Sequence, residues 1–309
     1  MSVNRIPIVI DCDPGTDDAI CIAAALLCDK NLDIRAITCV CGNVGVDRTS
    51  RNALDIVDLL GSDVPVSVGA HKPIRRELKM AISHGITGIG DVTLPRSTRN
   101  FHEKHAVDLL YDQVVKAEGA LEILAIGPLT NLALAIGKYP DFPTMVKKIT
   151  IMGGALIGGN MTMVSEFNIY NDPDAAKIVF DAGIPLVMVG LDVTLKPMLP
   201  DNILPQLAQV DTPHAKLVCR LLDFMVRRKE EIGGDNPNLH DVMALLAMVE
   251  PSLLTMQDYY MDVETEGRIT RGMTVADFLN VEGKAPNVSA ALDIDVAGFW
   301  DWFVTLFNR

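Results

Sequence analysis

Four carboxylates lie within eight residues near the N-terminus of this 309-residue chain. The segment Asp11-Cys12-Asp13-Pro14-Gly15-Thr16-Asp17-Asp18 follows a short apolar run and precedes an apolar stretch at 19–27. Like charges at the end of a buried strand repel one another, and several kcal/mol per ion oppose their removal from water. A divalent cation would make such a cluster favourable, and oxygen donors favour a hard ion, Ca²⁺ or Mg²⁺.

The turn inside this segment brings two of the acids together. Pro14 and Gly15 favour a sharp change of direction, so Asp13 and Asp18 can face one point from opposite sides of the turn. The alternative is a strand, a turn and a helix whose first residues are acidic, since Asp suits a helix N-terminus. One helix cap does not require four acids, so we expect a metal site here.

A second motif, Gly127-Pro128-Leu129-Thr130-Asn131, follows another apolar run. A strand that stops at a turn leaves backbone carbonyl groups free, and a hard cation can use such a carbonyl as a ligand. The same residues also suit the start of a helix. Both interpretations of Thr130 stay open at this level.

A third motif contains Glu166-Phe167-Asn168 and ends at Asp172-Pro173. Residues two apart in an extended segment face the same way, so Glu166 and Asn168 are expected on one side. A carboxylate and an amide on one face suit a ligand with several hydroxyl groups. A polar loop that caps a helix at 174 would account for Asp172 and Pro173, but not for Glu166 or Asn168.

Three further positions carry polar side chains with weaker local signals. His240-Asp241 follows a Gly-rich stretch at 233–237 and opens an apolar helix, where Asp241 could serve as the N-cap. Asn43 ends the second predicted strand and suits a turn equally well. His84 lies in Ser83-His84-Gly85-Ile86-Thr87-Gly88, either in a pocket or in an ordinary polar loop.

The composition excludes several classes of partner. A net charge of −13 disfavours nucleic acid and anionic membrane surfaces, and no basic cluster offsets it. The N-terminus has no signal-peptide pattern, because Asp11 interrupts the first apolar run, and no apolar run reaches the ~18–20 residues of a membrane span. Six cysteines without a zinc-type pair indicate reduced thiols. We expect a cytoplasmic protein with no membrane or nucleic-acid partner.

The elements that must position these motifs alternate between strand and helix. Apolar strand-like runs end at Asp11–Asp13, Asn43, Gly127, Gly153 and Gly190, with amphipathic segments between them. This order predicts one α/β domain over 1–309, with a largely parallel, mixed open sheet flanked by helices. Ligands in such sheets bind beyond the carboxyl ends of the strands. We also expect helices from about 201 to 250, a hairpin over 259–274 that makes the sheet mixed, and a mobile loop at about 71–101.

The motifs, in this order, resemble the inosine–uridine-preferring nucleoside hydrolases, from Ile8 to about Phe299. The resemblance implies the Rossmann-like open sheet of that family, homodimers or homotetramers, and Ca²⁺ as cofactor. It implies Ca²⁺ ligands at Asp13, Asp18, the Thr130 carbonyl and Asp241, with Asp13 also the general base. It further implies contacts to the nucleoside from Asp17, Asn43, His84, Met152, Asn160, Glu166, Asn168 and Asp241. In this family the residue matching His240 protonates the leaving base, which would make His240 catalytic. Asp11 is assigned a supporting role.

The function implied is hydrolysis of a small-molecule ribonucleoside to free base and ribose, in nucleoside salvage. Two alternatives remain. An Asp-nucleophile phosphohydrolase would fit Asp11-x-Asp13, but no Lys or Arg accompanies a strand-end motif to hold the phosphoryl group. A calcium-dependent nucleoside-binding protein without turnover would use the same residues. The base preference depends on loops near 80–90 and 225–240.

Overall fold

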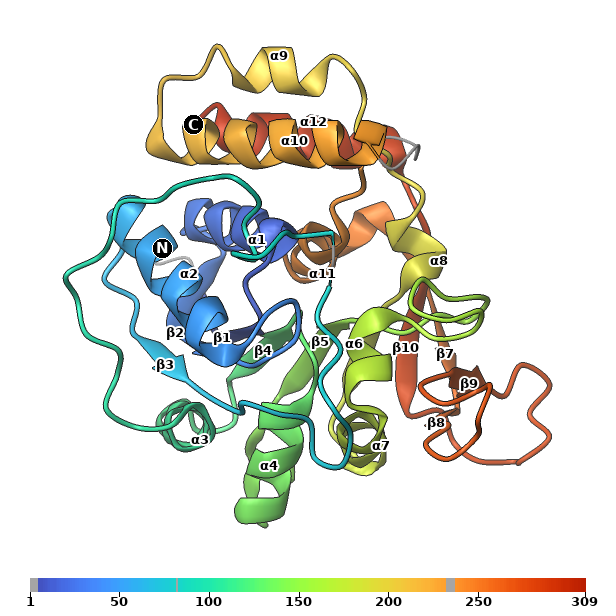
Figure 1. Ribbon diagram of the computed structural model, residues 1–309. Coiled ribbons are helices and arrows are strands. Elements are labelled where there is room, and N and C mark those ends of the chain that lie inside the picture. Colours follow the sequence, from blue (N-terminus) through green and yellow to red (C-terminus); the bar gives the residue numbers. More distant parts are fainter. Residues whose placement is uncertain (1–4, 82, 232–236) are drawn as a thin grey trace.

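A computed structural model describes residues 5–81, 83–231 and 237–309. Its centre is an eight-stranded sheet with the order β3-β2-β1-β4-β5-β6-β10-β7 (Figure 1). Every neighbouring pair is parallel except β10 and β7, which are antiparallel. The strands are β1 (Ile6–Cys12), β2 (Leu32–Cys39), β3 (Val66–Val68), β4 (Glu122–Ala125), β5 (Lys148–Met152), β6 (Leu186–Val189), β7 (Leu254–Tyr259) and β10 (Val288–Ile294).

Helices cover both faces of this sheet. Strand β1 explains why, because Ile8 and Ile10 point into one buried cluster and Val9 into the other. One cluster is covered by α1 (Thr16–Leu27), α2 (Val46–Leu59), α8 (Leu191–Thr194), α9 (Ile203–Leu207), α10 (Pro213–Glu231), α11 (His240–Val249) and α12 (Val296–Phe307). The other is covered by α3 (Ala106–Lys116), α4 (Thr130–Lys138), α5 (Phe142–Met145), α6 (Phe167–Asn171) and α7 (Pro173–Asp181).

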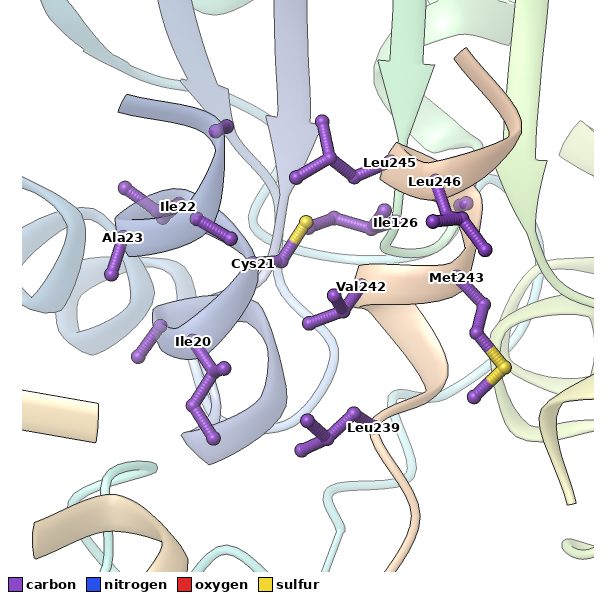
Figure 2. Close-up of a cluster of buried hydrophobic side chains, with 14 of the residues drawn as sticks. Ile20, Cys21, Ile22, Ala23, Ile126, Leu239, Val242, Met243, Leu245 and Leu246 are labelled. Atoms are coloured by element: carbon purple, nitrogen blue, oxygen red, sulfur yellow. The ribbon is translucent and has the colours of Figure 1, made fainter. Parts of the chain in front are cut away.

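The contact between α1 and α11 is central for function, because each helix begins at a polar motif. Their apolar side chains meet beside Ile126, with Cys21 and Val242 in the interface (Figure 2). The Cys21 thiol also donates a hydrogen bond to the Asp241 carbonyl oxygen, at 3.4 Å. The second turn of α1 is therefore held beside the first turn of α11.

The predicted fold class is confirmed, but one detail was wrong. The predicted hairpin contains an antiparallel pair, β8 (Met261–Val263) and β9 (Thr274–Ala276), which forms a separate two-stranded sheet. The mixed character of the main sheet comes from the edge strand β7 instead. The exposed polar residues Gln257 and Asp258 interrupt the apolar pattern of β7, so its sequence gave little strand signal.

The connection between β3 and α3 is long and irregular. Its described residues, 69–81 and 83–105, contain no helix or strand. Elsewhere in the chain, a single 3₁₀ turn, η1 (Pro251–Leu253), precedes β7. That the 71–101 loop is mobile stays a prediction. Predictions for 233–236 and for the N-terminal residues 1–4 lie outside the described residues.

All six cysteines are unpaired, and five of them are buried. Among the residues with described positions, no helix combines the length and the apolar character needed to cross a membrane.

Candidate active site

The acidic turn joins β1 to α1 and is almost completely buried. Asp11, Asp13, Asp17 and Asp18 are each 6% exposed or less. The Asp18 carboxylate accepts hydrogen bonds from the backbone N–H groups of Asp13 and Gly15, both at 3.0 Å. Asp18 therefore holds the turn and caps the first helix, which is the role that the alternative interpretation gave to these acids.

Asp13 has one oxygen held by the fold and one oxygen without a partner. The backbone N–H of Asn43 donates to Asp13 Oδ2 at 2.6 Å, whereas Asp13 Oδ1 is buried and has no hydrogen-bond partner. Gly42 and Gly127 pack so closely against this carboxylate that a Cβ atom at either would overlap it. The Asn43 amide also donates to the Asp13 carbonyl and to Asp18 Oδ2, both at 3.1 Å. Asn43 thus ties the end of β2 to the turn.

Asp17 connects the acidic turn to α11. Its Oδ2 atom accepts hydrogen bonds from the backbone N–H groups of His240 (3.0 Å) and Asp241 (3.4 Å). Asp241 is therefore not the N-cap of α11, since the helix begins at His240 and its first N–H groups bind a carboxylate from another segment. Asp17 Oδ1 is buried and has no partner. The Asp241 side chain is consequently left for other contacts.

Asp11 lies beneath the acidic turn and is bound by side chains of two other segments. Its Oδ1 atom accepts hydrogen bonds from the Thr38 hydroxyl (2.6 Å) and the Asn131 amide (2.8 Å), and Asn131 also contacts Cys39 and Ala70. Burial raises the pKa of Asp11 to about 7, against the lowering effect of these two donors. Asp11 thus joins β1, β2 and the start of α4 beneath the turn.

The electrostatics of the cluster favour a cation or protons. Burial raises the pKa of Asp13 and of Asp17 well above the usual range, and the neighbouring Asp18 raises both further. Burial and the charge of Asp17 do the same for Asp241, and burial raises the pKa of Asp18 to about 6. Within 5–81, 83–231 and 237–309, no three His, Cys, Asp or Glu side chains form a ready metal cage. The unpartnered oxygen of Asp13 and the mutual repulsion nevertheless fit an oxygen-binding divalent ion.

Thr130 begins α4 at the carboxyl end of β4, as the helical interpretation predicts. Its hydroxyl donates to Asp172 Oδ2 at 2.7 Å, and the same oxygen accepts the backbone N–H of Ile74 at 2.9 Å. Asp172 Oδ1 caps α7 through Ala175. The predicted cap role of Asp172 is confirmed, and Asp172 also fixes Thr130.

The geometry predicted for Glu166 and Asn168 was wrong, because the segment is helical rather than extended. Glu166 is the N-cap of α6, and its Oε2 atom accepts the backbone N–H groups of Gly154, Asn168 and Ile169. The Asn168 amide nitrogen donates to the carbonyl oxygens of Ile126 (3.0 Å) and Met152 (3.1 Å), at the ends of β4 and β5. The segment is helical because Glu166 satisfies two of the N–H groups at the start of α6, those of Asn168 and Ile169. Both side chains still lie at the carboxyl edge of the sheet.

Met152 and Asn160 occupy different positions around this edge. Met152 ends β5, is 4% exposed, and its sulfur lies 3.6 Å from the Asn168 amide nitrogen. Asn160 is exposed in the loop that follows, where its Oδ1 atom accepts the backbone N–H of Phe167 at 2.9 Å. Asn160 is thus held beside the start of α6.

Two histidines lie at the rim of the acidic cluster, each half-buried and fixed by a threonine. His84 Nδ1 accepts the backbone N–H of Thr16 at 3.1 Å and lies 2.7 Å from the Thr16 hydroxyl. This contact places the proton of neutral His84 on Nε2. His240 Nδ1 lies 2.8 Å from the Thr194 hydroxyl. Burial lowers the pKa of both histidines to about 4, so both are neutral at neutral pH.

Several residues that build the site gave no signal in the sequence. Thr38, Asn131 and Thr194 are fully buried and act through Asp11 or His240. Asn131 lies inside the motif that begins at Gly127, so its neighbours could have indicated it. Thr38 and Thr194 sit in ordinary apolar segments, and only the fold shows their contacts.

The chain is similar to known proteins over almost its whole length. Residues 8–301 match the model of the inosine-uridine preferring nucleoside hydrolases. The chain is 40% identical over 300 residues to the pyrimidine-specific ribonucleoside hydrolase RihA of Escherichia coli (strain SMS-3-5 / SECEC), covering 96% of each protein.

Solved structures agree with this similarity. The purine-preferring ribonucleoside hydrolase from Gardnerella vaginalis superimposes with a TM-score of 0.91 at 35% identity, covering 98% of both chains. The plant nucleoside hydrolase PpNRh1 gives a TM-score of 0.92 at 32% identity, covering 99% of both chains. With sequence and backbone in agreement from one end to the other, this chain belongs to the inosine-uridine preferring nucleoside hydrolase family.

Proposed function

We propose that this protein hydrolyses the N-glycosidic bond of ribonucleosides and releases the nucleobase and ribose. The main support is the buried Asp13 carboxylate, whose Oδ1 atom has no partner and lies beside Asp18 at the carboxyl edge of the sheet. Relatives over the full length are named ribonucleoside hydrolases. We further propose that the enzyme accepts a broad range of ribonucleosides or prefers inosine and uridine. We also propose that it acts in nucleoside salvage in the cytoplasm and forms a homodimer or homotetramer.

We assign the cofactor as Ca²⁺, held by Asp13, Asp18, Asp241 and the Thr130 carbonyl oxygen. The raised pKa values of these three buried carboxyl groups support a positive charge among them. When bound, a divalent ion lowers the pKa of a coordinated water and so supplies a nucleophile at neutral pH.

Asp13 is the general base in this proposal. Because the Asn43 N–H holds Oδ2, Oδ1 is the atom that takes a proton from the attacking water. The water oxygen bonds to C1′ of the ribose as the C1′–N bond breaks, and the bonding electron pair leaves with the base. Neutral His240 carries a single N–H, which stabilises the charge on the departing base by a hydrogen bond, and His84 Nε2–H is the next candidate.

The sugar contacts follow from which atoms the fold leaves unused. Asp17 Oδ1 has no hydrogen-bond partner. Three backbone N–H groups donate to Glu166 Oε2, which leaves Glu166 Oε1 for substrate. The Asn168 amide nitrogen donates to two backbone carbonyl groups, which leaves the Asn168 Oδ1 atom for substrate. All three remaining atoms are acceptors. They suit the hydroxyl groups of ribose, which are donors, and Asn43, Met152, Asn160 and Asp241 complete the proposed surface.

Chromatography of the common ribonucleosides after incubation with the protein tests the proposal. We expect free base and ribose, and the Asp13→Asn variant should form them far more slowly. Intact nucleosides together with binding by calorimetry would contradict hydrolysis and favour a binding protein. Phosphate release from a panel of phosphomonoesters would instead favour the phosphohydrolase.

A separate experiment tests the metal. Prolonged chelation should abolish turnover, and Ca²⁺ should restore it, with metal content followed by elemental analysis. Asp18→Asn removes a charge and keeps an oxygen for only one of the two turn N–H groups, because the N–H groups of Asp13 and Gly15 bind different oxygens of Asp18. The variant should therefore bind less metal and be somewhat less stable than the parent. Full activity in metal-free protein would contradict the metal assignment.

A further inference from the structure

Asn52, on α2, joins two segments of the candidate site that are far apart in sequence. Its side chain is 8% exposed, and the amide nitrogen donates to the carbonyl oxygens of Pro14 (3.0 Å) and Thr87 (2.9 Å). Pro14 lies in the acidic turn, and Thr87 lies in the segment 83–90. Both protons of one amide are therefore used to hold two backbone segments together.

The segment 83–90 contacts the acidic turn at close range. His84 accepts the Thr16 N–H through Nδ1, and the Gly90 N–H donates to the His84 carbonyl oxygen at 2.9 Å. Gly88 has a φ of +86°, and a Cβ atom there would lie 3.0 Å from the Asn52 amide nitrogen and 3.1 Å from the Pro14 carbonyl oxygen. Only glycine suits both the backbone angle and the space, so the approach of this segment to the turn is close.

The outer side of the segment has contacts at its C-terminal end, where Ile89 is buried in the core cluster and Phe224 of α10 lies so close to Gly90 that a Cβ atom there would overlap its ring. A surface cavity of about 420 Å³ lies there, lined by Asn52, Thr87 and Ile89 together with side chains of α2 and the 92–101 chain. The neighbouring Ile86 is 86% exposed. Around residues 84–87 the hydrogen bonds to Asn52 and Thr16 therefore contribute to holding the segment in position.

We propose that Asn52 is a positioning residue that fixes the segment 83–90 against the acidic turn and so holds His84 at the substrate site. The inference rests on the proposed function for the part that concerns substrate. Two hydrogen bonds, each contributing about 0.5–1.5 kcal/mol net, correspond to a change of about 5- to 150-fold in the opening equilibrium of the segment.

Hydrogen exchange read by mass spectrometry tests the positioning step without any need for turnover. In Asn52→Ala, amides in 83–92 should exchange about 5- to 150-fold faster, whereas the sheet should be unchanged. Asn52→Asp presents oxygens to both carbonyl groups, so its effect should be larger. The matched control is Asp55→Asn, on the same helix and cavity, because Asp55 binds Ser97 and Arg51 rather than 83–90. Unchanged exchange in both Asn52 variants, or equal acceleration in the control, would overturn the proposal.

Kinetics test whether Asn52 acts through His84. Loss of a pre-positioned segment lowers apparent affinity by the fraction of molecules in the competent state, so KM should rise more than kcat falls. In an Asn52→Ala/His84→Ala double variant, the Asn52 change should add little to the effect of His84→Ala. Additive effects would show that Asn52 does not act through His84. If no variant or parent has turnover, the proposed function fails, while the exchange result still decides the positioning role.

Discussion

Replacement of Asp13 by Asn should change activity and metal-free stability in opposite directions. Asn has nearly the same shape, and its side-chain oxygen can still accept the Asn43 N–H that Asp13 Oδ2 accepts at 2.6 Å. The amide nitrogen then occupies the place of Oδ1, the buried oxygen without a partner. The variant keeps the fold but lacks both the proton acceptor and one negative charge.

The expected sizes follow from these two losses. Removal of a general base slows turnover by about 10²–10⁴-fold. Burial and Asp18 raise the pKa of Asp13 in the folded, metal-free protein, so at neutral pH folding costs free energy that Asn does not incur. We expect the free energy of unfolding to rise by about 1–3 kcal/mol without metal, typical of relieving a poorly satisfied buried polar group. With Ca²⁺ at 100 times its Kd, the parent gains about 2.7 kcal/mol, and the variant should lose much of this gain.

The assay is chemical denaturation with chelator and with Ca²⁺, beside kcat/KM for a ribonucleoside. Asp11→Asn is the matched control, because Asp11 is equally buried with a raised pKa but binds Thr38 and Asn131. It should keep most of its activity and its response to Ca²⁺. An Asp13→Asn protein that turns over like its parent, or that gains as much stability from Ca²⁺, would refute both roles of Asp13.

Three further predictions concern the sugar, the leaving base and pH. The kcat/KM for uridine should exceed that for 2′-deoxyuridine by ~10⁴-fold or more, because the deoxy substrate leaves buried acceptors without a hydroxyl donor. Equal values would show that Glu166 and Asn168 do not recognise the sugar hydroxyl groups. His240→Ala should slow inosine strongly and p-nitrophenyl riboside hardly at all, since nitrophenolate leaves unaided; equal slowing would assign His240 to positioning. Burial raises the pKa of Glu166 from 4.5 to about 7. The unfolded chain therefore releases this proton first as pH rises, and metal-free stability should fall between pH 4.5 and 7 by up to about 3 kcal/mol more than in Glu166→Gln, measured by denaturation; parallel pH profiles would contradict that shift.

Local sequence was sufficient where the structural cause is local. The acidic turn could be predicted because Pro14, Gly15 and the four acids are contiguous, and the α/β class because apolar runs alternate with amphipathic segments. The carboxyl-edge rule then placed Asp13, Asn43, Gly127 and Gly153 at one side of the sheet, and all four follow the ends of parallel neighbouring strands in the structure.

Sequence reasoning failed where the partner comes from another element. No local pattern shows that Asp17 caps α11 across 223 positions, or that Thr194 fixes His240. The spacing of Glu166 and Asn168 suggested an extended segment. In the structure Glu166 is instead the N-cap of α6 and accepts hydrogen bonds from its first free N–H groups. The edge strand β7 was not predicted because it contains exposed polar residues, which break the apolar alternation typical of a strand. A strand at the edge of a sheet tolerates such residues where they face solvent.

One feature of the site links these findings to its chemistry: the fold holds part of each acid or amide and leaves the rest. Backbone N–H groups donate to Asp13 Oδ2, Asp17 Oδ2 and Glu166 Oε2. The Asn168 amide nitrogen donates to two carbonyl groups at the ends of strands. Each side chain is therefore fixed in orientation without exhausting its acceptors, and Asp13 Oδ1 and Asp17 Oδ1 are left buried without a hydrogen-bond partner. Because buried acceptors without donors are unfavourable, the site gains most from a ligand that brings a cation and several hydroxyl groups together.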